Sequence, residues 1–403
     1  MAKQIKILLF TGSFPPPLVG GSVEYIYNYT NNLPNNTCTI HTSLNKWDDN
    51  LFDRTFKQNV IRRFYINNVH KKHSRYKLIR KLSVFLEFLC WPITAFCLIL
   101  YKKPDVVNIG EHNFSGIGVW LACKILRIPY VYFTYAEEIT MLTKKPVQNW
   151  LFSRLLIDSS CIISVSNYTK DVLITNHKLN PNKIKVVLPS VSDRKSFLNN
   201  QNNIQRALKK YNLVSKFILL TVGSIEPRKG HISVLEAIVK LKNKIPNLLY
   251  VIVGSGPSRP DLDIFIQNND IHSHVLFMGR IGDELLNDLY DICDVFVLLH
   301  RQIKDNLNTE GCPTVFLEAS SHGKPVIGGN AGGVHDAILH GITGYIIDGE
   351  NVDQFCIKLI ELLENQNLRK KLGENGKNYT AKLKPEITAD LIYNYNIEIT
   401  NRR

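Results

Sequence analysis

Short apolar runs, bounded by Gly, Pro or Asn, alternate with longer segments of mixed character along the first 190 residues. Runs of about four to eight apolar residues are typical of strands that are buried on both faces of a sheet. Because the segments between them are mostly long enough for helices, the alternation predicts a parallel sheet covered on both faces. The predicted strands are residues 5–12, 38–43, 60–66, 105–111, 130–135, 161–166 and 184–190.

The pattern changes after Ser190, where a polar, Asn-rich stretch (190–211) predicts a linker that leads into a short helix. A second alternating set then begins. We therefore predict an α/β fold in which two Rossmann-like, doubly wound domains, residues 1–190 and 191–385, face a central cleft. In such sheets, ligands bind beyond the carboxyl ends of the strands. The predicted strands of the second domain are residues 217–224, 249–256, 275–281, 295–300, 325–329 and 344–348.

The composition fits a chain that buries a core in each domain, since 44% of its 403 residues are hydrophobic. Its eight cysteines are scattered without a CxxC pair, and the N-terminal residues lack the cleavage pattern of a signal peptide. These features predict a reduced, cytoplasmic protein without a structural zinc site.

The net charge of +14 is concentrated in the first domain, where Arg54 to Lys81 contains ten Lys or Arg and no acid. A nearly continuous apolar run (82–101) follows it. This run is long enough for a membrane span, although Glu87 and Pro92 interrupt it. It could also be a buried helix. We favour a helix whose basic flank docks on an anionic membrane surface. No nucleic-acid partner is predicted, because no recognition motif accompanies the charge.

Adjacent cations, Arg228 and Lys229, lie in a loop that follows one predicted strand and opens a helix. Such a pair suits a diphosphate, because arginine binds as a fork and lysine as a point charge. A solvated pair is the alternative, but cations are unfavourable at the N-terminus of a helix. Two weaker candidates are the backbone near Arg280 and Ile281, which could contact a base, and the Gly-rich residues 328–336, which also fit a plain turn.

Two carboxylates, Glu310 and Glu318, flank a turn that runs into a predicted helix. Carboxylates can accept hydrogen bonds from sugar hydroxyls, and a helix N-terminus binds phosphate. A nucleotide sugar carries both groups, so the pair predicts a nucleotide-sugar site. The alternative is that the glutamates only complement the helix dipole.

In this order, the motifs closely resemble those of the family 4 retaining glycosyltransferases, which have the GT-B fold. The most specific part is Glu310, seven residues and Glu318, followed by Ala, small residues and GKPV, with VGS and PRKG upstream. The resemblance covers most of the chain and is weaker in the first half. It also implies that a C-terminal helix within residues 386–403 packs back on the first domain.

The resemblance implies roles for individual residues. Arg228 and Lys229 would bind the donor diphosphate, Glu318 the ribose hydroxyls, and Glu310 the transferred sugar. Backbone amides at the start of the helix would contact phosphate, and a GGS loop of the first domain would approach the diphosphate. The candidate catalytic residues are Glu310, Arg228 and Lys229, and the candidate donor-binding residues are Gly21, Arg228, Lys229, Arg280, Ile281, Glu310, Thr314, Val315 and Glu318.

The first half departs from the family pattern at two places. Asn108 and Gly110 stand where many members have histidines, and Tyr135 stands where many have another. Nearby Glu111 and His112 could substitute. We therefore take Glu111, His112 and Tyr135 as candidates for acceptor or sugar contacts.

We expect a retaining glycosyltransferase that needs no metal or other cofactor and moves a sugar from a nucleotide-sugar donor to a glycan or lipid-linked acceptor in cell-surface polysaccharide biosynthesis. It would work in the cytoplasm, peripherally on the inner face of the cytoplasmic membrane. The alternative is a non-catalytic chain of the same fold that binds a nucleotide sugar or glycan. Glycoside hydrolysis is disfavoured, because eight residues of continuous helix would separate the two carboxylates by about 12 Å, more than hydrolase pairs require.

Overall fold

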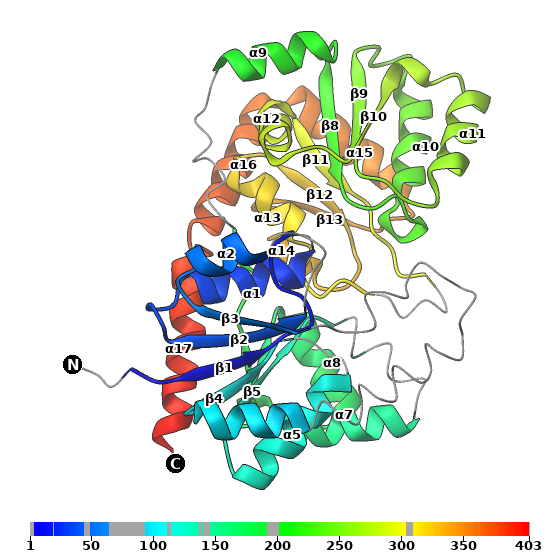
Figure 1. The fold of residues 1–403 in the computed structure, drawn as a ribbon. Helices are drawn as coiled ribbons and strands as arrows, with labels where there is room; N and C mark the ends of the chain where they lie inside the picture. The colour runs from blue at the N-terminus through cyan, green and yellow to red at the C-terminus, as the bar shows by residue number, and fades with distance from the viewer. Residues whose placement is uncertain are drawn as a thin grey trace, which may run out of the picture. The chain divides into compact units, whose positions relative to one another are not determined.

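The computed structural model describes residues 4–18, 20–43, 49–63, 93–110, 114–136, 139, 146–191, 201–303 and 309–402. The chain divides into two compact units (Figure 1). The first comprises Met1–Ser190 together with Pro385–Arg403, and the second comprises Val191–Lys384. Each unit is built on one sheet.

The first unit contains a parallel sheet of seven strands in the order β3-β2-β1-β4-β5-β6-β7. The order reverses between β1 and β4, as in a doubly wound sheet. The strands are β1 (Ile7–Phe10), β2 (Cys38–Ser43), β3 (Asn59–Arg63), β4 (Val106–Ile109), β5 (Tyr130–Thr134), β6 (Cys161–Ser164) and β7 (Ile184–Val186).

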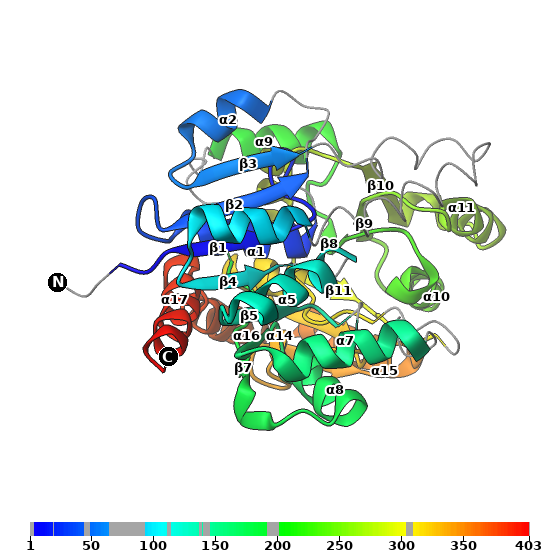
Figure 2. The same ribbon diagram turned by 60° about the horizontal axis from the view of Figure 1, so that its bottom comes forward.

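Helices cover both faces of this sheet (Figures 1 and 2). Residues 93–102, α5, α7 and α8 pack on the face that carries Leu8, Val107 and Tyr132. On the other face, Tyr29 of α1 contacts Phe133 and accepts hydrogen bonds from Asn108 and from Asn396 of α17. The helices are α1 (Gly21–Asn31), α2 (Asp49–Thr55), α5 (Phe114–Leu126), α7 (Pro146–Asp158), α8 (Asn167–His177) and α17 (Pro385–Asn401).

The second unit contains a parallel sheet of six strands in the order β10-β9-β8-β11-β12-β13. Here the order reverses between β8 and β11. The strands are β8 (Phe217–Val222), β9 (Leu248–Val253), β10 (Val275–Gly279), β11 (Val295–Leu298), β12 (Val326–Gly329) and β13 (Gly344–Ile347).

The side chains of these strands alternate between two apolar cores, which explains why the strands read as continuous apolar runs. Leu219 and Val297 face one core, which α10, α11 and α15 cover. Leu220 and Phe296 face the other, which α12, α13 and α14 cover. The helices are α9 (Gln201–Lys210), α10 (His231–Leu241), α11 (Arg259–Asn268), α12 (Asp283–Ile292), α13 (Thr314–Ser321), α14 (Val334–Ala337), α15 (Val352–Glu364) and α16 (Gln366–Thr380).

The predicted α/β class is therefore confirmed, with two parallel, doubly wound sheets. Of the apolar run 82–101, residues 82–92 lie outside the described residues, and 93–102 are helical. Ala95, Leu98 and Ile99 of this helix are buried in the core of the first unit. Within the described residues, no helix is both long and apolar enough to span a bilayer.

Candidate active site

The loop after β8 brings its two cations to the point where the strand order of the second sheet reverses. Pro227–Lys229 form one turn of 3₁₀ helix, and Gly230 then starts α10 in the left-handed region, at φ 69°. A Cβ on Gly230 would lie 1.8 Å from the carbonyl oxygen of Leu299, directly after β11. Glycine is therefore required for the loop to pack this closely against the end of β11.

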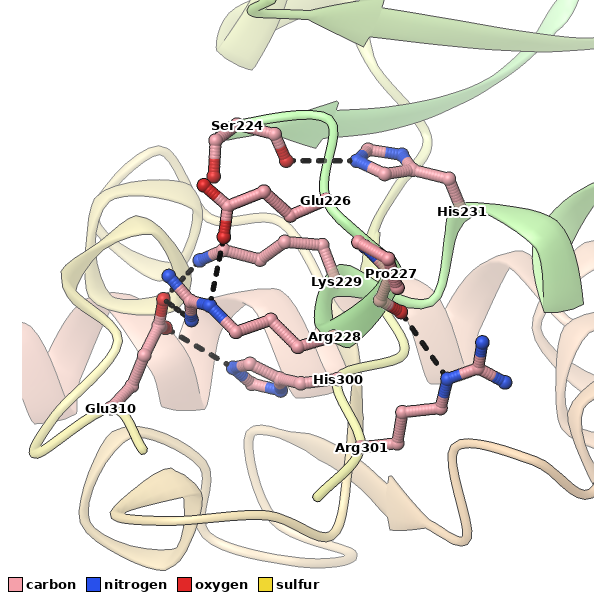
Figure 3. Close-up of polar contacts among 9 residues, drawn as sticks. All are labelled: Ser224, Glu226, Pro227, Arg228, Lys229, His231, His300, Arg301 and Glu310. Carbon is pink, nitrogen blue, oxygen red and sulfur yellow. Dashed lines mark hydrogen bonds and ion pairs between the residues drawn. The ribbon is translucent and has the colours of Figure 1, made fainter. Parts of the chain in front are cut away.

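The loop after β11 is joined to the same turn. The backbone N–H of Arg301 donates to the carbonyl of Arg228 at 3.0 Å, and its Nε donates to the carbonyl of Pro227 at 3.2 Å. The preceding residue, His300, is buried. These contacts hold the ends of two neighbouring strands together beside the cations (Figure 3).

Glu310 is positioned by its backbone. Its carbonyl accepts a hydrogen bond of 3.0 Å from the N–H of Gly333, and a Cβ on Gly332 (φ 57°) would lie 2.3 Å from that carbonyl. The Gly-rich turn before α14 therefore packs directly against Glu310, so one of the two weak sequence candidates has a structural role in this site.

The side chain of Glu310 accepts from both predicted cations (Figure 3). Arg228 Nη1 donates to Glu310 Oε1 at 2.7 Å, and Lys229 Nζ donates to the same oxygen. Arg228 also donates through Nε to Glu226 Oε2 at 3.0 Å. The structure thus brings together the three residues predicted to be catalytic, in a cluster with two cations and two carboxylates.

The electrostatics of the cluster keep the Glu310 carboxyl ionised. Burial raises its pKa, but the charge of Lys229 lowers it strongly, with help from His300 and Arg228. The pKa of this carboxyl therefore lies well below its usual value of 4.5. Burial lowers the pKa of Arg228, but the charges and hydrogen bonds of Glu310 and Glu226 together outweigh burial and raise the pKa. Glu310 thus pairs with the two cations that are predicted to bind a diphosphate.

His300 is a site residue that the sequence does not predict. Its Nε2 lies 3.4 Å from Glu310 Oε2, and its Nδ1 has no hydrogen-bond partner among the described residues. The available signal was its position, since it ends an apolar strand run beside the topological reversal.

A hydrogen-bonded chain supports the loop from beneath. His231 Nε2 donates to the Ser224 carbonyl at 3.2 Å, and the Tyr250 hydroxyl lies 3.0 Å from both His231 Nδ1 and Thr221 Oγ1. Thr221 in turn donates to the Val297 carbonyl. Burial lowers the pKa of His231 to about 4, so its imidazole is neutral at pH 7.

Glu318 lies on α13, one turn after Thr314. Tyr290 donates to Glu318 Oε2 at 2.9 Å, and Thr314 Oγ1 is 3.4 Å from Oε1. Thr314 and Val315 are the first two residues of this helix. Glu318 and the N-terminal residues Thr314 and Val315 thus belong to the same helix, α13.

The remaining candidates lie elsewhere. Arg280 is exposed after the edge strand β10, and Ile281 packs on the core beside α12. In the first unit, Gly21 begins α1, and Tyr135 donates to the carbonyl of Gly110 at 2.8 Å. Glu111 and His112 lie outside the described residues.

Among the described residues, no group of three or more His, Cys, Asp or Glu side chains is arranged to hold a metal ion. The predicted absence of a metal requirement stays a prediction.

Two family profiles match the chain along most of its length. Residues 203–379 match "Glycosyl transferases group 1", and residues 19–195 match "Glycosyltransferase Family 4". The chain belongs to glycosyltransferase family 4. It is accordingly a retaining glycosyltransferase that transfers a sugar from a nucleotide sugar.

Relatives of known name extend the comparison. The chain is 28% identical over 298 residues to the GDP-mannose-dependent alpha-(1-6)-phosphatidylinositol monomannoside mannosyltransferase of Mycolicibacterium smegmatis, covering 70% of this chain and 77% of that protein. It is 25% identical over 292 residues to the capsular polysaccharide biosynthesis glycosyltransferase CapM of Staphylococcus aureus, covering 70% and 73%.

Among solved structures, the Anabaena protein HepE in complex with UDP is similar, with a TM-score of 0.75 and 15% identity over 96% of this chain and 98% of that one. This likeness shows that the glycosyltransferase has the GT-B fold.

Proposed function

We propose that this family 4 glycosyltransferase moves a hexose from a nucleoside-diphosphate sugar to a lipid-linked or glycan acceptor during the synthesis of cell-surface polysaccharide or glycolipid. The named relatives support the acceptor class, since one acts on a phosphatidylinositol mannoside and another in capsular polysaccharide biosynthesis. Its place of work would be the inner face of the cytoplasmic membrane, as a peripheral protein.

The observation that carries the donor assignment is the ion cluster at the ends of β8 and β11. Lys229 and Arg228 both contact Glu310 Oε1, at the point where doubly wound sheets bind ligands. When the donor enters, its diphosphate takes over the two cations, because phosphate accepts bidentate bonds from Arg and the charge of Lys. Glu310 is then released to accept a hydrogen bond from the transferred sugar.

The leaving diphosphate is stabilised by Lys229, Arg228 and the backbone N–H groups at the start of α13, which Thr314 and Val315 begin. Because these groups neutralise the charge that develops as the bond to the sugar breaks, the reaction runs without a metal ion. The acceptor hydroxyl attacks on the face that the diphosphate leaves, and a phosphate oxygen takes its proton. The bond to the acceptor oxygen replaces the bond to the diphosphate oxygen, with retention at the anomeric carbon.

Glu318 binds the ribose hydroxyls of the donor. Its carboxylate is oriented by Tyr290, which donates to Oε2 at 2.9 Å. This leaves Oε1, 3.4 Å from Thr314 Oγ1, as the oxygen turned toward the helix N-terminus. The Glu318 carboxylate thus lies beside the N-terminus of α13, which is proposed to bind the phosphate.

The test is transfer of labelled sugar from UDP-, GDP- and ADP-sugars to a lipid extract, in the presence of EDTA. We expect one donor class to support transfer, and Lys229→Ala to lose most of it while remaining folded. Lys371→Ala, an exposed lysine of α16, is the matched control and should be fully active. Near-normal transfer by Lys229→Ala would refute the site, and activity that EDTA removes and Mg²⁺ restores would refute metal independence.

A further inference from the structure

Three helices of the first unit expose apolar side chains where surface helices normally carry polar ones. They are the helical residues 93–102, α5 and α7, which pack on one face of the sheet. α5 packs beside α7, and Figure 2 shows α5 between α7 and the unlabelled cyan helix of residues 93–102. Because the three helices share one sheet face, their outward sides point the same way.

The outward positions follow helical spacing. On α7 they are Val147, Trp150, Arg154 and Ile157, all exposed, whereas Phe152 and Leu155 of the same helix are buried. The other two helices likewise have one exposed side and one buried side. We call the exposed apolar residues together the apolar face: Ile93, Leu100, Tyr101, Leu121, Ile125, Val147, Trp150 and Ile157.

These eight residues are half of the sixteen large hydrophobic side chains that are exposed in the described part of the chain. The exposed fractions are substantial, with 79% for Tyr101, 67% for Ile125 and 57% for Trp150. Single exposed apolar residues need no explanation, but a concentration of them on one face marks an interaction surface.

The charged residues of these helices are almost all cations. Lys102, Lys124 and Arg154 each lie over an aromatic ring of their own helix, at 5.3, 5.4 and 5.8 Å from the ring centre. Asp158 is the one carboxylate in the described residues of the three helices, and Lys124 already pairs with it at 2.7 Å. The cations therefore border the apolar face without opposing charges to neutralise them all.

A pocket of about 530 Å³ adds to this positive charge at the ends of α5 and α7. Its lining includes the cations Lys124, Arg127 and Arg402 and the carboxylate of Asp158. Three cations against one carboxylate favour an anionic group such as a phosphate.

We propose that the apolar face docks on the surface of an anionic lipid bilayer, with head-group phosphates meeting the bordering cations and the basic pocket. Trp and Tyr, whose rings are apolar with a polar edge, and the long side chains of Lys and Arg suit this boundary between water and lipid. A second copy is the competing occupant. In a symmetric contact the same face would meet itself, bringing cations together without acids to pair them.

This inference rests on the proposed function only in that a lipid-linked acceptor requires the enzyme to reach a membrane. It names a surface of the first unit that is separate from the donor-binding cluster of the second. The two can therefore fail independently.

The test is flotation of the full chain with vesicles of phosphatidylcholine alone or mixed with phosphatidylglycerol. We expect binding to the anionic vesicles, weakened by added salt. The double variant Ile125→Asp/Trp150→Asp should bind about tenfold more weakly or worse, because two interfacial side chains are lost. Both positions are more than half exposed, so the fold is retained.

The matched control is Ile264→Asp/Ile357→Asp, at positions 58% and 63% exposed on α11 and α15 of the second unit. It should float like the unmodified chain. Equal flotation of the Ile125→Asp/Trp150→Asp variant, or no binding of the unmodified chain to anionic vesicles, would overturn the proposal. So would a dimer in lipid-free solution that this variant converts to a monomer, since the face would then join two copies.

Thermal shifts with nucleoside diphosphates on the same samples separate the two proposals. A chain that binds vesicles but no nucleotide contradicts the proposed function alone. A chain that binds a nucleotide but no vesicles contradicts the membrane face alone.

Discussion

In the proposed mechanism, Glu310 competes with the incoming diphosphate for Arg228 and Lys229. Both cations contact its Oε1, and its pKa is held well below the usual value of 4.5, so the competition exists at every physiological pH. Removing a negative charge from a cation pair generally leaves those cations more available to another anion. The proposed mechanism therefore predicts that Glu310 opposes diphosphate binding and assists sugar transfer.

Glu310→Gln should strengthen the binding of the nucleoside diphosphate and weaken the transfer of the sugar. We expect tighter binding of the free nucleoside diphosphate, by about tenfold for a lost competing charge at the edge of a site. Transfer should fall sharply, because the neutral amide oxygen of Gln accepts a hydrogen bond from the sugar hydroxyl more weakly than the charged carboxylate does. Isothermal titration with the nucleoside diphosphate and a transfer assay with its sugar conjugate measure the two effects. Weaker nucleotide binding by this variant would contradict the competition.

Glu318→Ala should remove the recognition of ribose. The unmodified enzyme is expected to prefer a nucleoside diphosphate over its 2′,3′-dideoxy analogue by about tenfold or more, since hydrogen bonds to a charged group contribute about 1.5–3 kcal/mol. In Glu318→Ala this preference should disappear, and in Tyr290→Phe it should shrink, because Tyr290 orients the carboxylate. Competition binding with the two nucleotides checks it. A preference that survives in Glu318→Ala would show that other groups bind the ribose.

The sequence predicted much of this cluster at the residue scale. Residue type and a specific motif predict Arg228, Lys229 and Glu310 as site residues, and the structure places them in contact. His300 is not among the predicted site residues, because its position at the end of an apolar run points to a site only once the strand order is known. Its closeness to Glu310 depends on the strand order, which places β11 beside β8.

At the scale of elements, the start of α10 is joined to three strands by the chain of contacts from Ser224 to Val297. Neutral His231 has one N–H, so the four contacts in this chain share only three protons, from His231, Tyr250 and Thr221. Protonation of His231 would supply the fourth proton, but burial and the nearby Lys229 charge disfavour the charged imidazole.

The lowered pKa of His231 predicts acid-sensitive stability of the second unit. Its folded value is about 4, against an ordinary value of 6.5. Between these values the unfolded chain binds a proton that the folded chain does not, so stability is lost as the pH falls from about 6.5 toward 4. The loss is up to about 3 kcal/mol.

Urea unfolding at several pH values measures this effect. The loss between pH 6.5 and 5 should be smaller in His231→Gln, and Glu310 contributes little there because its pKa lies below 4.5. An identical pH dependence in the variant would mean that His231 is protonated as readily in the folded chain as in the unfolded chain. Its hydrogen-bond partners would then offset the effect of burial on its pKa.

The apolar run 82–101 shows a limit of sequence patterns. The apolar run 82–101 suggested one element, but periodicity alone could not say which of its sides is buried. In the structure Ala95 and Leu98 face the core, whereas Leu100 and Tyr101 face solvent. This depends on packing beside α5, which no local pattern encodes.

At the scale of the whole molecule, the chain returns to its first unit at the end. α17 packs against α1, β4 and β6, and Asn396 donates to the Tyr29 hydroxyl at 3.2 Å. Ala389 and Ile392 of α17 are fully buried or nearly so. The second unit, Val191–Lys384, is thus one continuous segment, whereas the first needs both ends of the chain.

This division predicts that residues 191–384 fold alone and keep nucleotide affinity from their own cluster, whereas a chain ending at Lys384 has a destabilised first unit. Removing α17 exposes the core beneath it, where each large buried aliphatic side chain contributes about 1.5–3 kcal/mol. Thermal unfolding of the truncated chain in two steps would support this, if only the step of the first unit has a lowered midpoint temperature. A single lowered transition in which both units unfold together would contradict it.

The strand order of both sheets was predictable from sequence only as a class. Alternating apolar runs and helices specify a doubly wound sheet, since crossovers between parallel strands are right-handed and short. The sequence did not show that β3 and β7 are the edges of the first sheet. That choice depends on which helix covers which face, a property of the assembled unit.

We propose that Arg228 and Lys229 bind the donor diphosphate without a metal ion. The most direct test is titration of UDP, GDP and ADP into the full chain in EDTA, beside Lys229→Ala and the control Lys371→Ala. We predict that one nucleotide binds the unmodified chain and the control equally. Its affinity for Lys229→Ala should fall about tenfold to a hundredfold, because a charge-assisted bond to phosphate is lost. Unchanged affinity in Lys229→Ala would show that Lys229 does not bind the diphosphate.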